Sequence, residues 1–176
     1  MKLYTRKGDD GKTNIIGSSR LTKDHKRISS YGVVDELNAI LGITRGLVDS
    51  NIQREILHIQ NLLFEIGAEL ASEVPRNKLL ISDVKYLEDL IDSATKNTPE
   101  LKSFILPGGT NSASWLHFAR TVTRRAEREI VALDQDEELN QFIIPWINRL
   151  SDLFFAWSRL ENFSKSIGEH IWEARN

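Results

Sequence analysis

The chain has 176 residues, of which 27% are charged, and its formal net charge at pH 7 is −2. This length is typical of a single domain with a sizeable core, and so balanced a charge argues against a chain shaped as a nucleic-acid binder. Cysteine is absent, which excludes both a disulfide framework and a thiolate metal site.

The first 25 residues are rich in Gly, Asp, Lys, Ser and Thr and have little apolar periodicity, so they predict an irregular loop. The loop contains Gly11-Lys12-Thr13, the ending of a P-loop, but Arg6 occupies the position where the full motif needs its first glycine. The P-loop hypothesis therefore fails. Small residues beside Lys12 and Thr13 would still let backbone N–H groups approach a phosphate, and a solvated turn is the alternative.

From Arg27 onward, apolar residues recur at helical spacing. The clearest stripe predicts a helix of about five turns and consists of Ile52, Ile56, Ile59, Leu63, Ile66 and Leu70. Similar stripes predict helices over residues 28–47, 84–94, 116–133 and 147–160, the last ending near Gly168. We expect Ser82 to cap the third helix and Pro145 to lie in or near the first turns of the fifth.

Breakers separate these segments at Pro75, residues 97–99 and residues 107–109, and no strand of convincing length appears. Residues 104–106 are too short to build a sheet. The predicted fold class is therefore all-α, an antiparallel five-helix bundle over residues 26–168 within a single domain of residues 1–176.

An arginine run on the fourth predicted helix is the first candidate for chemistry. Residues four apart on a helix are displaced by only about 40°, so Arg120, Arg124 and Arg128 form one ridge with Arg125 beside it. Guanidinium groups stacked in this way repel each other unless something negative lies along them. Small residues on the adjoining face predict partial burial, which calls for an anion such as a triphosphate or the carboxylate of Asp35. A solvated face with weak surface ion pairs is the alternative.

Three other patterns in the sequence are weaker signals of function. Residues 148–152 place polar side chains on a mostly apolar helix, which predicts burial and either a structural network or ligand contact. Glu55 and His58 have di-iron ligand spacing, but the sequence has no second copy of the pair, so a di-metal bundle is disfavoured. We expect a structural hydrogen-bond role for His117.

Five ordered blocks resemble the PduO-type ATP:cob(I)alamin adenosyltransferases and span nearly the whole chain. The blocks are Tyr4-Thr-Arg-Lys-Gly-Asp-Asp-Gly-Lys-Thr13, Tyr31-Gly-Val-Val-Asp-Glu-Leu-Asn38, Phe104-Ile-Leu-Pro-Gly-Gly-Thr110, Leu116-His-Phe-Ala-Arg-Thr-Val-Thr-Arg-Arg-Ala-Glu-Arg128 and Asn148-Arg-Leu-Ser-Asp-Leu-Phe154. The resemblance implies a homotrimer of five-helix bundles with active sites between subunits.

The resemblance also implies the reaction. The 5′-deoxyadenosyl group of ATP passes to the cobalt of cob(I)alamin, giving adenosylcobalamin and triphosphate, and Mg²⁺ accompanies the ATP. A non-catalytic sensor or delivery protein that binds ATP and adenosylcobalamin would carry the same motifs and is the alternative. We expect a cytoplasmic protein, since no apolar signal core or membrane-spanning run is present. Its product would pass to an adenosylcobalamin-dependent enzyme, and neither nucleic acid nor membrane is an expected partner.

The implied catalytic residues are Arg124, Asp35, Arg120 and Phe104. Asp35 would pair with Arg120 across a subunit boundary, and Phe104 would face the corrin and displace its lower axial ligand. No metal-ligating residue is implied. The residues implied to bind ATP are Thr5, Arg6, Lys7, Gly8, Thr13, Asn14, Lys23, Arg124, Arg125, Glu127, Arg128 and Asn148. One departure is Lys7, where the family often has Thr: a backbone contact would survive this change, whereas a hydroxyl contact would not.

Overall fold

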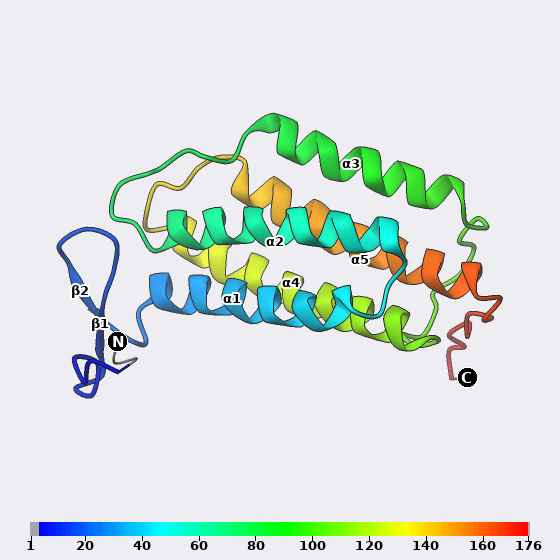
Figure 1. Cartoon of the computed structure of the whole chain (residues 1–176), viewed down its shortest axis with the longest axis horizontal. Helices are drawn as coiled ribbons and strands as arrows, with labels where there is room; N and C mark the ends of the chain where they lie inside the picture. Colours follow the sequence, from blue (N-terminus) through cyan, green and yellow to red (C-terminus); the bar gives the residue numbers. More distant parts are fainter. Residues whose placement is uncertain (1–3, 176) are drawn as a thin grey trace.

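The computed structural model describes residues 4–175 and consists mainly of five helices, as predicted (Figure 1). The helices are α1 (Lys26–Arg45), α2 (Ser50–Leu70), α3 (Ile81–Lys96), α4 (Asn111–Asp134) and α5 (Ile143–Ser164). Successive helices run in opposite directions along the bundle, which agrees with the antiparallel prediction (Figure 1). However, α3 packs along α5 in the same direction, because the connections before α3 and before α5 both start from the same end of the bundle.

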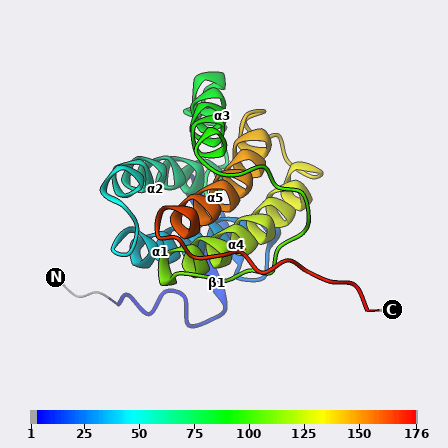
Figure 2. The ribbon, with the colours of Figure 1, turned by 90° about the vertical axis from the view of Figure 1, so that its right-hand side faces the viewer.

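The hydrophobic stripes account for the packing. Every residue of the predicted α2 stripe is buried. Helix α5 lies innermost, with α4 along one side and α3 along another (Figure 2). It contributes Trp146 and Phe154, which are the two largest fully buried side chains among the described residues. Within residues 4–175, no helix is both long and apolar enough to cross a membrane.

The helix ends differ from the sequence predictions at α1 and α3 and agree with them at Pro145. Helix α1 ends at Arg45, so Leu47 lies in the following turn and is 40% exposed. The predicted cap at Ser82 is wrong, because the N-cap is Leu80, two residues earlier, and the Asp83 carboxylate accepts a hydrogen bond from the backbone N–H of Leu80 at 2.8 Å. Pro145 is the third residue of α5, as predicted, where a missing N–H costs no helical hydrogen bond.

The predicted irregular loop is wrong for part of residues 4–25. Strands β1 (Lys12–Asn14) and β2 (Arg20–Thr22) form an antiparallel hairpin in which Thr13 pairs with Leu21. Strands this short and this exposed have no apolar alternation, so the sequence contains no periodic signal for them. The hairpin stands at the end of the bundle where α1 begins (Figure 1). Residues 1–3 of the predicted loop lie outside the described residues.

The opposite end of the bundle carries a second short pairing. Residue Ile105, in the connection before α4, forms a single antiparallel bridge with Ile171 of the C-terminal tail. The N–H of Trp172 donates to the carbonyl of Phe104, and the N–H of Leu106 donates to the carbonyl of His170, both at 2.8 Å. This one bridge agrees with the prediction that residues 104–106 cannot build a sheet.

Candidate functional site

The arginine ridge runs along α4, and burial distinguishes Arg120 from the other three. Arg120 is half-buried, whereas Arg124, Arg125 and Arg128 are exposed. The Nε atom of Arg120 is buried and has no hydrogen-bond partner among the described residues. Burial, and then the neighbouring charge of Arg124, lower the pKa of Arg120. The predicted partial burial of the ridge is therefore confirmed at Arg120, and its demand for an anion is not met within the described chain.

The exposed arginines make different contacts. Arg125 forms an ion pair with Glu36 of α1, and an Nη1–H of Arg128 donates to the carbonyl of Arg124 at 2.9 Å. Among residues 4–175, neither Arg124 nor Arg128 forms an ion pair with a carboxylate. The ion-paired surface that was the alternative to a functional ridge is therefore present only at Arg125.

Asp35 lies on α1 and is exposed beside a groove between α1 and α2. The groove has a volume of about 340 Å³, and its walls include Tyr31, Leu63 and Phe64. Phe64 is 70% exposed although it is a large apolar residue. Within the described chain, Asp35 does not pair with Arg120, so the two residues are not brought together by the fold of a single chain.

Asn148 of α5 links the ridge to the helices behind it. Its Nδ2–H donates to Oε1 of Glu127 at 2.9 Å, and its Oδ1 accepts from Nη1 of Arg149 at 2.9 Å. Asn148 is half-buried and Ser151 is buried, but Asp152 is exposed, so the predicted burial of residues 148–152 is wrong at Asp152. The structural network that we expected as one alternative is present. It also fixes the orientation of Glu127 beside the arginines.

The predicted nucleotide residues of the N-terminal segment lie on the hairpin and on the loop before it. The Nζ of Lys23 approaches Gly8 so closely that a Cβ at Gly8 would lie 3.3 Å from it. The N–H of Lys23 donates to the carbonyl of Gly11 at 2.9 Å. Thr13 and Asn14 lie on β1. The fold thus gathers Gly8, Thr13, Asn14 and Lys23, which are up to 15 positions apart in the sequence.

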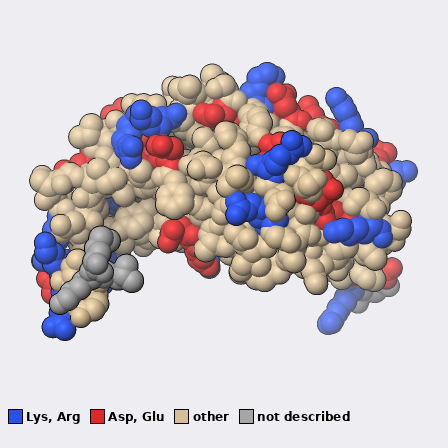
Figure 3. Space-filling model, in the orientation of Figure 1, with Lys and Arg blue, Asp and Glu red and all other residues tan. Residues whose placement is uncertain are grey.

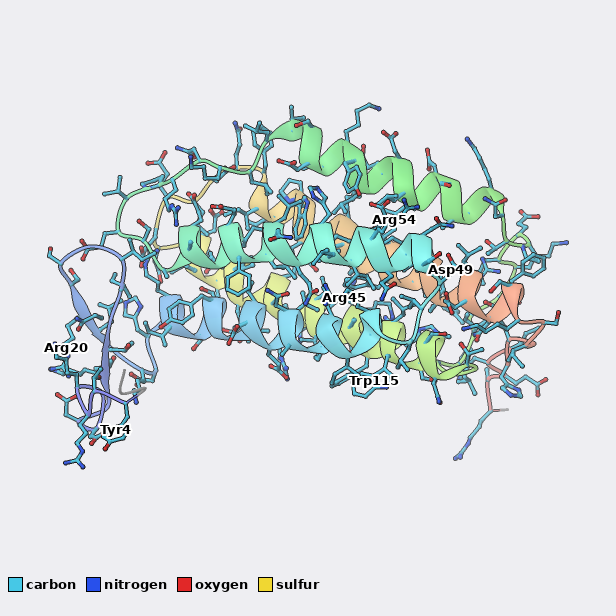
Figure 4. The ribbon with its side chains drawn as sticks, in the orientation of Figure 1. Tyr4, Arg20, Arg45, Asp49, Arg54 and Trp115 are labelled. Atoms are coloured by element: carbon cyan, nitrogen blue, oxygen red, sulfur yellow. The ribbon has the colours of Figure 1, made fainter. Side chains whose placement is uncertain are left out.

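The loop before β1 is cross-linked by Arg20. Its Nη2 donates to Oδ1 of Asp10 at 2.8 Å and also to the carbonyl of Lys7, while the N–H of Lys7 lies 3.4 Å from Oγ1 of Thr5. Arg6 has a left-handed backbone with φ of 60°, and its guanidinium lies over the ring of Tyr4. Figure 4 shows Tyr4 and Arg20 together at this end of the molecule.

Phe104 lies at the other end of the bundle and is 80% exposed. Its ring meets the ring of Trp172 edge-on, with centroids 6.5 Å apart. The whole length of α4, about 36 Å at 1.5 Å per residue, separates this end from the hairpin (Figure 1). A single chain therefore does not bring Phe104 together with the N-terminal residues.

The remaining sequence candidates have structural roles or none. Glu55 accepts a hydrogen bond from the hydroxyl of Tyr86, whose pKa is raised first by burial and then by Glu55. The ring of His58 packs edge-on against Tyr86 at 5.1 Å. In the described part of the chain, no group of three His, Cys, Asp or Glu residues is placed to hold a metal ion.

His117 does not have the hydrogen-bond role that we expected. It is buried beside Phe155, and neither ring nitrogen has a partner among the described residues. Burial, with a smaller contribution from Arg120, lowers the pKa of His117 to about 4. His117 is therefore a neutral core residue near neutral pH.

The described surface carries both signs of charge. On the face shown in Figure 3, lysines and arginines are interspersed with aspartates and glutamates.

Sequence reasoning missed two contacts that organise the site, the Arg125–Glu36 pair and the bonds of Glu73 to the hairpin turn. Each joins residues far apart in the sequence, so no local spacing signals it.

Comparisons with known proteins identify the family of this chain. Residues 3–161 match the family described as cobalamin adenosyltransferase. The corrinoid adenosyltransferase of Bacillus subtilis is 45% identical over 180 aligned residues, which cover 98% of this chain and 93% of the relative. The corrinoid adenosyltransferase PduO of Citrobacter freundii is 42% identical, and the match covers 92% of this chain but 50% of that protein.

Solved structures lead to the same family. A variant of the PduO-type ATP:corrinoid adenosyltransferase from Lactobacillus reuteri, with a phenylalanine replaced by alanine and with cobalamin and ATP bound, has a TM-score of 0.92 and 42% identity, covering 98% of this chain and 100% of that one. A variant of that enzyme with an arginine replaced by lysine, complexed with ATP, has a TM-score of 0.90 and 43% identity, covering 97% and 100%. This chain therefore belongs to the cobalamin adenosyltransferase family and is of the PduO type.

Proposed function

We propose that this protein transfers the 5′-deoxyadenosyl group of ATP to the cobalt of cob(I)alamin. In this reaction the cobalt attacks C5′, a cobalt–carbon bond forms, and the C5′–O bond breaks with its electron pair leaving on the triphosphate. The observation that carries the proposal is the arginine ridge of α4, where Arg120 is half-buried without an anion and Arg124 has no ion pair in the described chain. Relatives that bind cobalamin and ATP support it.

The arrangement suits the charge that develops in this reaction. The departing triphosphate gains negative charge as the C5′–O bond breaks, so cations that bind it better than they bind ground-state ATP accelerate the step. Arg124, Arg125 and Arg128 lie on one exposed surface and are proposed to take this role. The cobalt substrate supplies the nucleophile, so the reaction requires no protein base. The protein's remaining task is to hold two bulky substrates in line.

The ATP site is proposed to combine the N-terminal segment with the ridge. The segment contributes Thr5, Arg6, Lys7, Gly8, Thr13, Asn14 and Lys23, and the ridge contributes Arg124, Arg125, Glu127, Arg128 and Asn148. The close approach of Lys23 to Gly8 supports this, because it places a positive charge beside a residue that has no side chain. Phosphate oxygens accept hydrogen bonds, so a backbone contact at Lys7 would use its N–H, which lies 3.4 Å from Oγ1 of Thr5.

Phe104 is proposed to contact the corrin. Its exposed ring offers an apolar surface to a flat macrocycle, and contact there would displace the lower axial ligand of the cobalt. Because the hairpin and Phe104 lie at opposite ends of one chain, a site that uses both must combine two subunits. This separation supports active sites between subunits, and we propose that the subunits form a homotrimer.

Asp35 and Arg120 are proposed to pair across that subunit boundary. The support is that Asp35 is exposed beside an apolar groove, whereas Arg120 lacks an anion within the described chain. Replacing Asp35 by Asn should weaken both the trimer and turnover, whereas Asp89→Asn on the exposed face of α3 is the matched control. Sedimentation and activity measured together test this, and an unchanged assembly in Asp35→Asn would contradict the pairing.

Mg²⁺ is proposed to arrive with the ATP. No cluster of three ligating side chains exists within residues 4–175, but Mg²⁺ in nucleotide sites is usually held by phosphate oxygens and water with one or two carboxylates. Glu127, held by Asn148 beside the arginines, could supply such a carboxylate. The residues present therefore fit a metal that is carried by the substrate.

The direct test is to mix the protein with ATP, Mg²⁺ and cob(I)alamin and follow the absorption spectrum. We expect the spectrum of adenosylcobalamin to appear together with free triphosphate. Binding of both substrates without this change would instead identify a non-catalytic sensor or delivery protein. A cytoplasmic location and transfer of the product to an adenosylcobalamin-dependent enzyme remain predictions.

A further inference from the structure

The turn of the hairpin is attached to the bundle by Glu73, which follows α2. The Glu73 carboxylate accepts from the N–H groups of Ser18 at 3.2 Å and Ser19 at 2.7 Å. Two backbone bonds flank this contact, from Ile16 N–H to the carbonyl of Ala71 at 2.7 Å and from Glu73 N–H to the carbonyl of Ile16 at 3.1 Å. The turn is thus held by four hydrogen bonds to two residues, Ala71 and Glu73.

A glycine makes this contact possible. Gly17 has a left-handed backbone with φ of 134°, and a Cβ on it would collide with Oε2 of Glu73. The hydrogen bonds from Ser19 and Ser18 lower the pKa of Glu73, so the carboxylate is ionised at neutral pH and its bonds to the turn are charge-assisted. Ile16 is half-exposed, so apolar burial contributes little to holding the turn, and the hydrogen bonds matter more.

The segment that carries Glu73 is itself fixed from behind by a buried arginine. Arg27 is 4% exposed, and its Nη1 donates to the carbonyls of Leu70 and Ser72, each at 2.6 Å. Arg27 also pairs with Glu137, just beyond the end of α4. The first turn of α1, the end of α2 and the end of α4 therefore meet at one buried cation, which gives Glu73 a rigid base.

The hairpin connects this anchor to the nucleotide residues. Its two strands pair Thr13 with Leu21 and Asn14 with Arg20, directly beside the anchored turn. The strand pairing continues to Lys12 and Thr22, after which Lys23 bonds back to Gly11. A shift of the turn would therefore move the proposed nucleotide ligands Thr13, Asn14 and Lys23 as a unit.

We propose that Glu73 is a positioning residue for the ATP site. It does not touch the nucleotide; it holds the turn at residues 16–19 and so sets where the hairpin presents Thr13, Asn14 and Lys23. This inference rests on the proposed function, because the residues that Glu73 positions are those proposed to bind ATP.

The test compares Glu73→Ala with Glu65→Ala, a matched control that removes an exposed carboxylate of α2 whose ion pair with Arg76 spans 3.8 Å. In Glu73→Ala we expect the KM for ATP to rise about tenfold, as loss of charge-assisted hydrogen bonds predicts. The kcat and the KM for cobalamin should stay within about twofold, because the proposed ridge and corrin contacts are intact. Glu73→Gln should lie between, because its amide oxygen still accepts one bond.

Hydrogen exchange and direct titration with ATP give readouts that need no turnover. In Glu73→Ala, the amides of residues 15–22 should exchange faster while those of α2 do not, and the Kd for ATP should rise by the same factor as the KM. Gly17→Ala should reproduce both effects although Glu73 itself is not substituted, because the alanine side chain would push the Glu73 carboxylate away from the turn. Wild-type binding of ATP without turnover would overturn the proposed function but leave the positioning role intact.

Three results would overturn the positioning role. An unchanged KM and Kd for ATP in Glu73→Ala would show that the anchor does not serve the nucleotide. A raised KM without faster exchange of the turn would mean that Glu73 acts on ATP directly. Absence of any ATP binding by the wild-type protein would remove the ligand that the hairpin is proposed to place.

Discussion

The two ends of the bundle present opposite chemistry. At the hairpin end, charged hydrogen bonds hold exposed polar residues in place, including those from Arg20 to Asp10 and from the turn to Glu73. At the other end, Phe104 and Trp172 are exposed apolar side chains on a short backbone bridge. A surface of cations and backbone donors suits a polyphosphate, whereas exposed aromatic rings suit a flat apolar ligand. A single chain therefore has both a surface suited to polyphosphate and a surface suited to a flat apolar ligand, and the two lie about one helix length apart.

A buried arginine lies beneath each end of the bundle. Arg27 ties three helix termini together under the hairpin. Under Phe104, the tail is held by Arg159 of α5, which is 7% exposed and bonds to both carboxylate oxygens of Glu169 at 2.9 and 3.2 Å. Each end thus depends on one buried arginine. The following predictions test whether the two ends can be disturbed separately.

The largest expected effect is at the base of the hairpin. Replacing Arg27 by Met should cost about 3–5 kcal/mol of unfolding free energy, because it leaves Glu137 and two backbone carbonyls without their partner. Denaturant unfolding measures this. The control is Lys26→Met, which removes the adjacent exposed pair with Asp136 and should cost at most about 1 kcal/mol. Equal costs for the two variants would mean that the hairpin end does not depend on a buried arginine.

The next effect concerns the ridge between the two ends. Arg124→Ala should remove roughly 3 kcal/mol of transition-state stabilisation, which lowers kcat about 150-fold, if it binds the departing triphosphate as an oxyanion donor does. Steady-state turnover with ATP and cob(I)alamin measures it. The control is Arg54→Ala, which removes an exposed arginine of α2 that donates a hydrogen bond to Asn51. This variant should turn over normally. Wild-type turnover in Arg124→Ala would exclude the assigned role.

Acid should weaken the Phe104 end through His117. Its pKa in the folded protein is lowered to about 4 from an ordinary value of 6.5, so the unfolded state binds the extra proton between these values. Stability is therefore complete above pH 6.5 and falls as the pH drops towards 4, by at most about 3 kcal/mol. His117→Phe should flatten this dependence, as measured by unfolding at pH 8, 6 and 4.5. An equally steep loss in the variant would assign it to other groups.

The smallest effect is expected at Phe104. Phe104→Ala should leave the Kd for ATP unchanged but slow the formation of Co(I) from Co(II) cobalamin by about tenfold, as the loss of one aromatic contact predicts. The rate with Co(II) plus a reductant, compared with the rate from preformed cob(I)alamin, separates the two steps. Phe163→Ala, another exposed phenylalanine near the same end, is the control. A normal rate from Co(II) in Phe104→Ala would contradict the corrin contact.

The apolar stripe of α2 and the arginine ridge of α4 could be predicted from residue spacing, because helix geometry alone places such residues on one face. The 4, 3, 4, 3, 4 spacing in α2 places every stripe residue on one face, and all of them are buried. The same helix geometry predicts from spacing alone that Arg120, Arg124 and Arg128 form one ridge. The cap of α3 was predicted wrongly because the N-cap is the apolar residue Leu80, whose backbone N–H donates to Asp83 three residues later.

Other features had no local signal. The hairpin strands are three residues long and exposed, so neither apolar alternation nor burial marks them. Ser151 and Asp152 both belong to the polar group at residues 148–152. The packing of α5 against its neighbours buries Ser151 and leaves Asp152 exposed. The contact of Glu73 with Ser18 and Ser19 joins residues 54 and 55 positions apart, which no spacing rule reaches.

By itself, the sequence determined the number, order and apolar faces of the helices, because helix periodicity and chain breakers act within a few residues. It also determined, through its five blocks, the family to which the chain belongs. Only the tertiary structure decided which arginine of the ridge is buried, which pairs with Glu36, and where the hairpin is anchored. These depend on which helices pack together, since burial and charge pairing arise from neighbours that are distant along the chain.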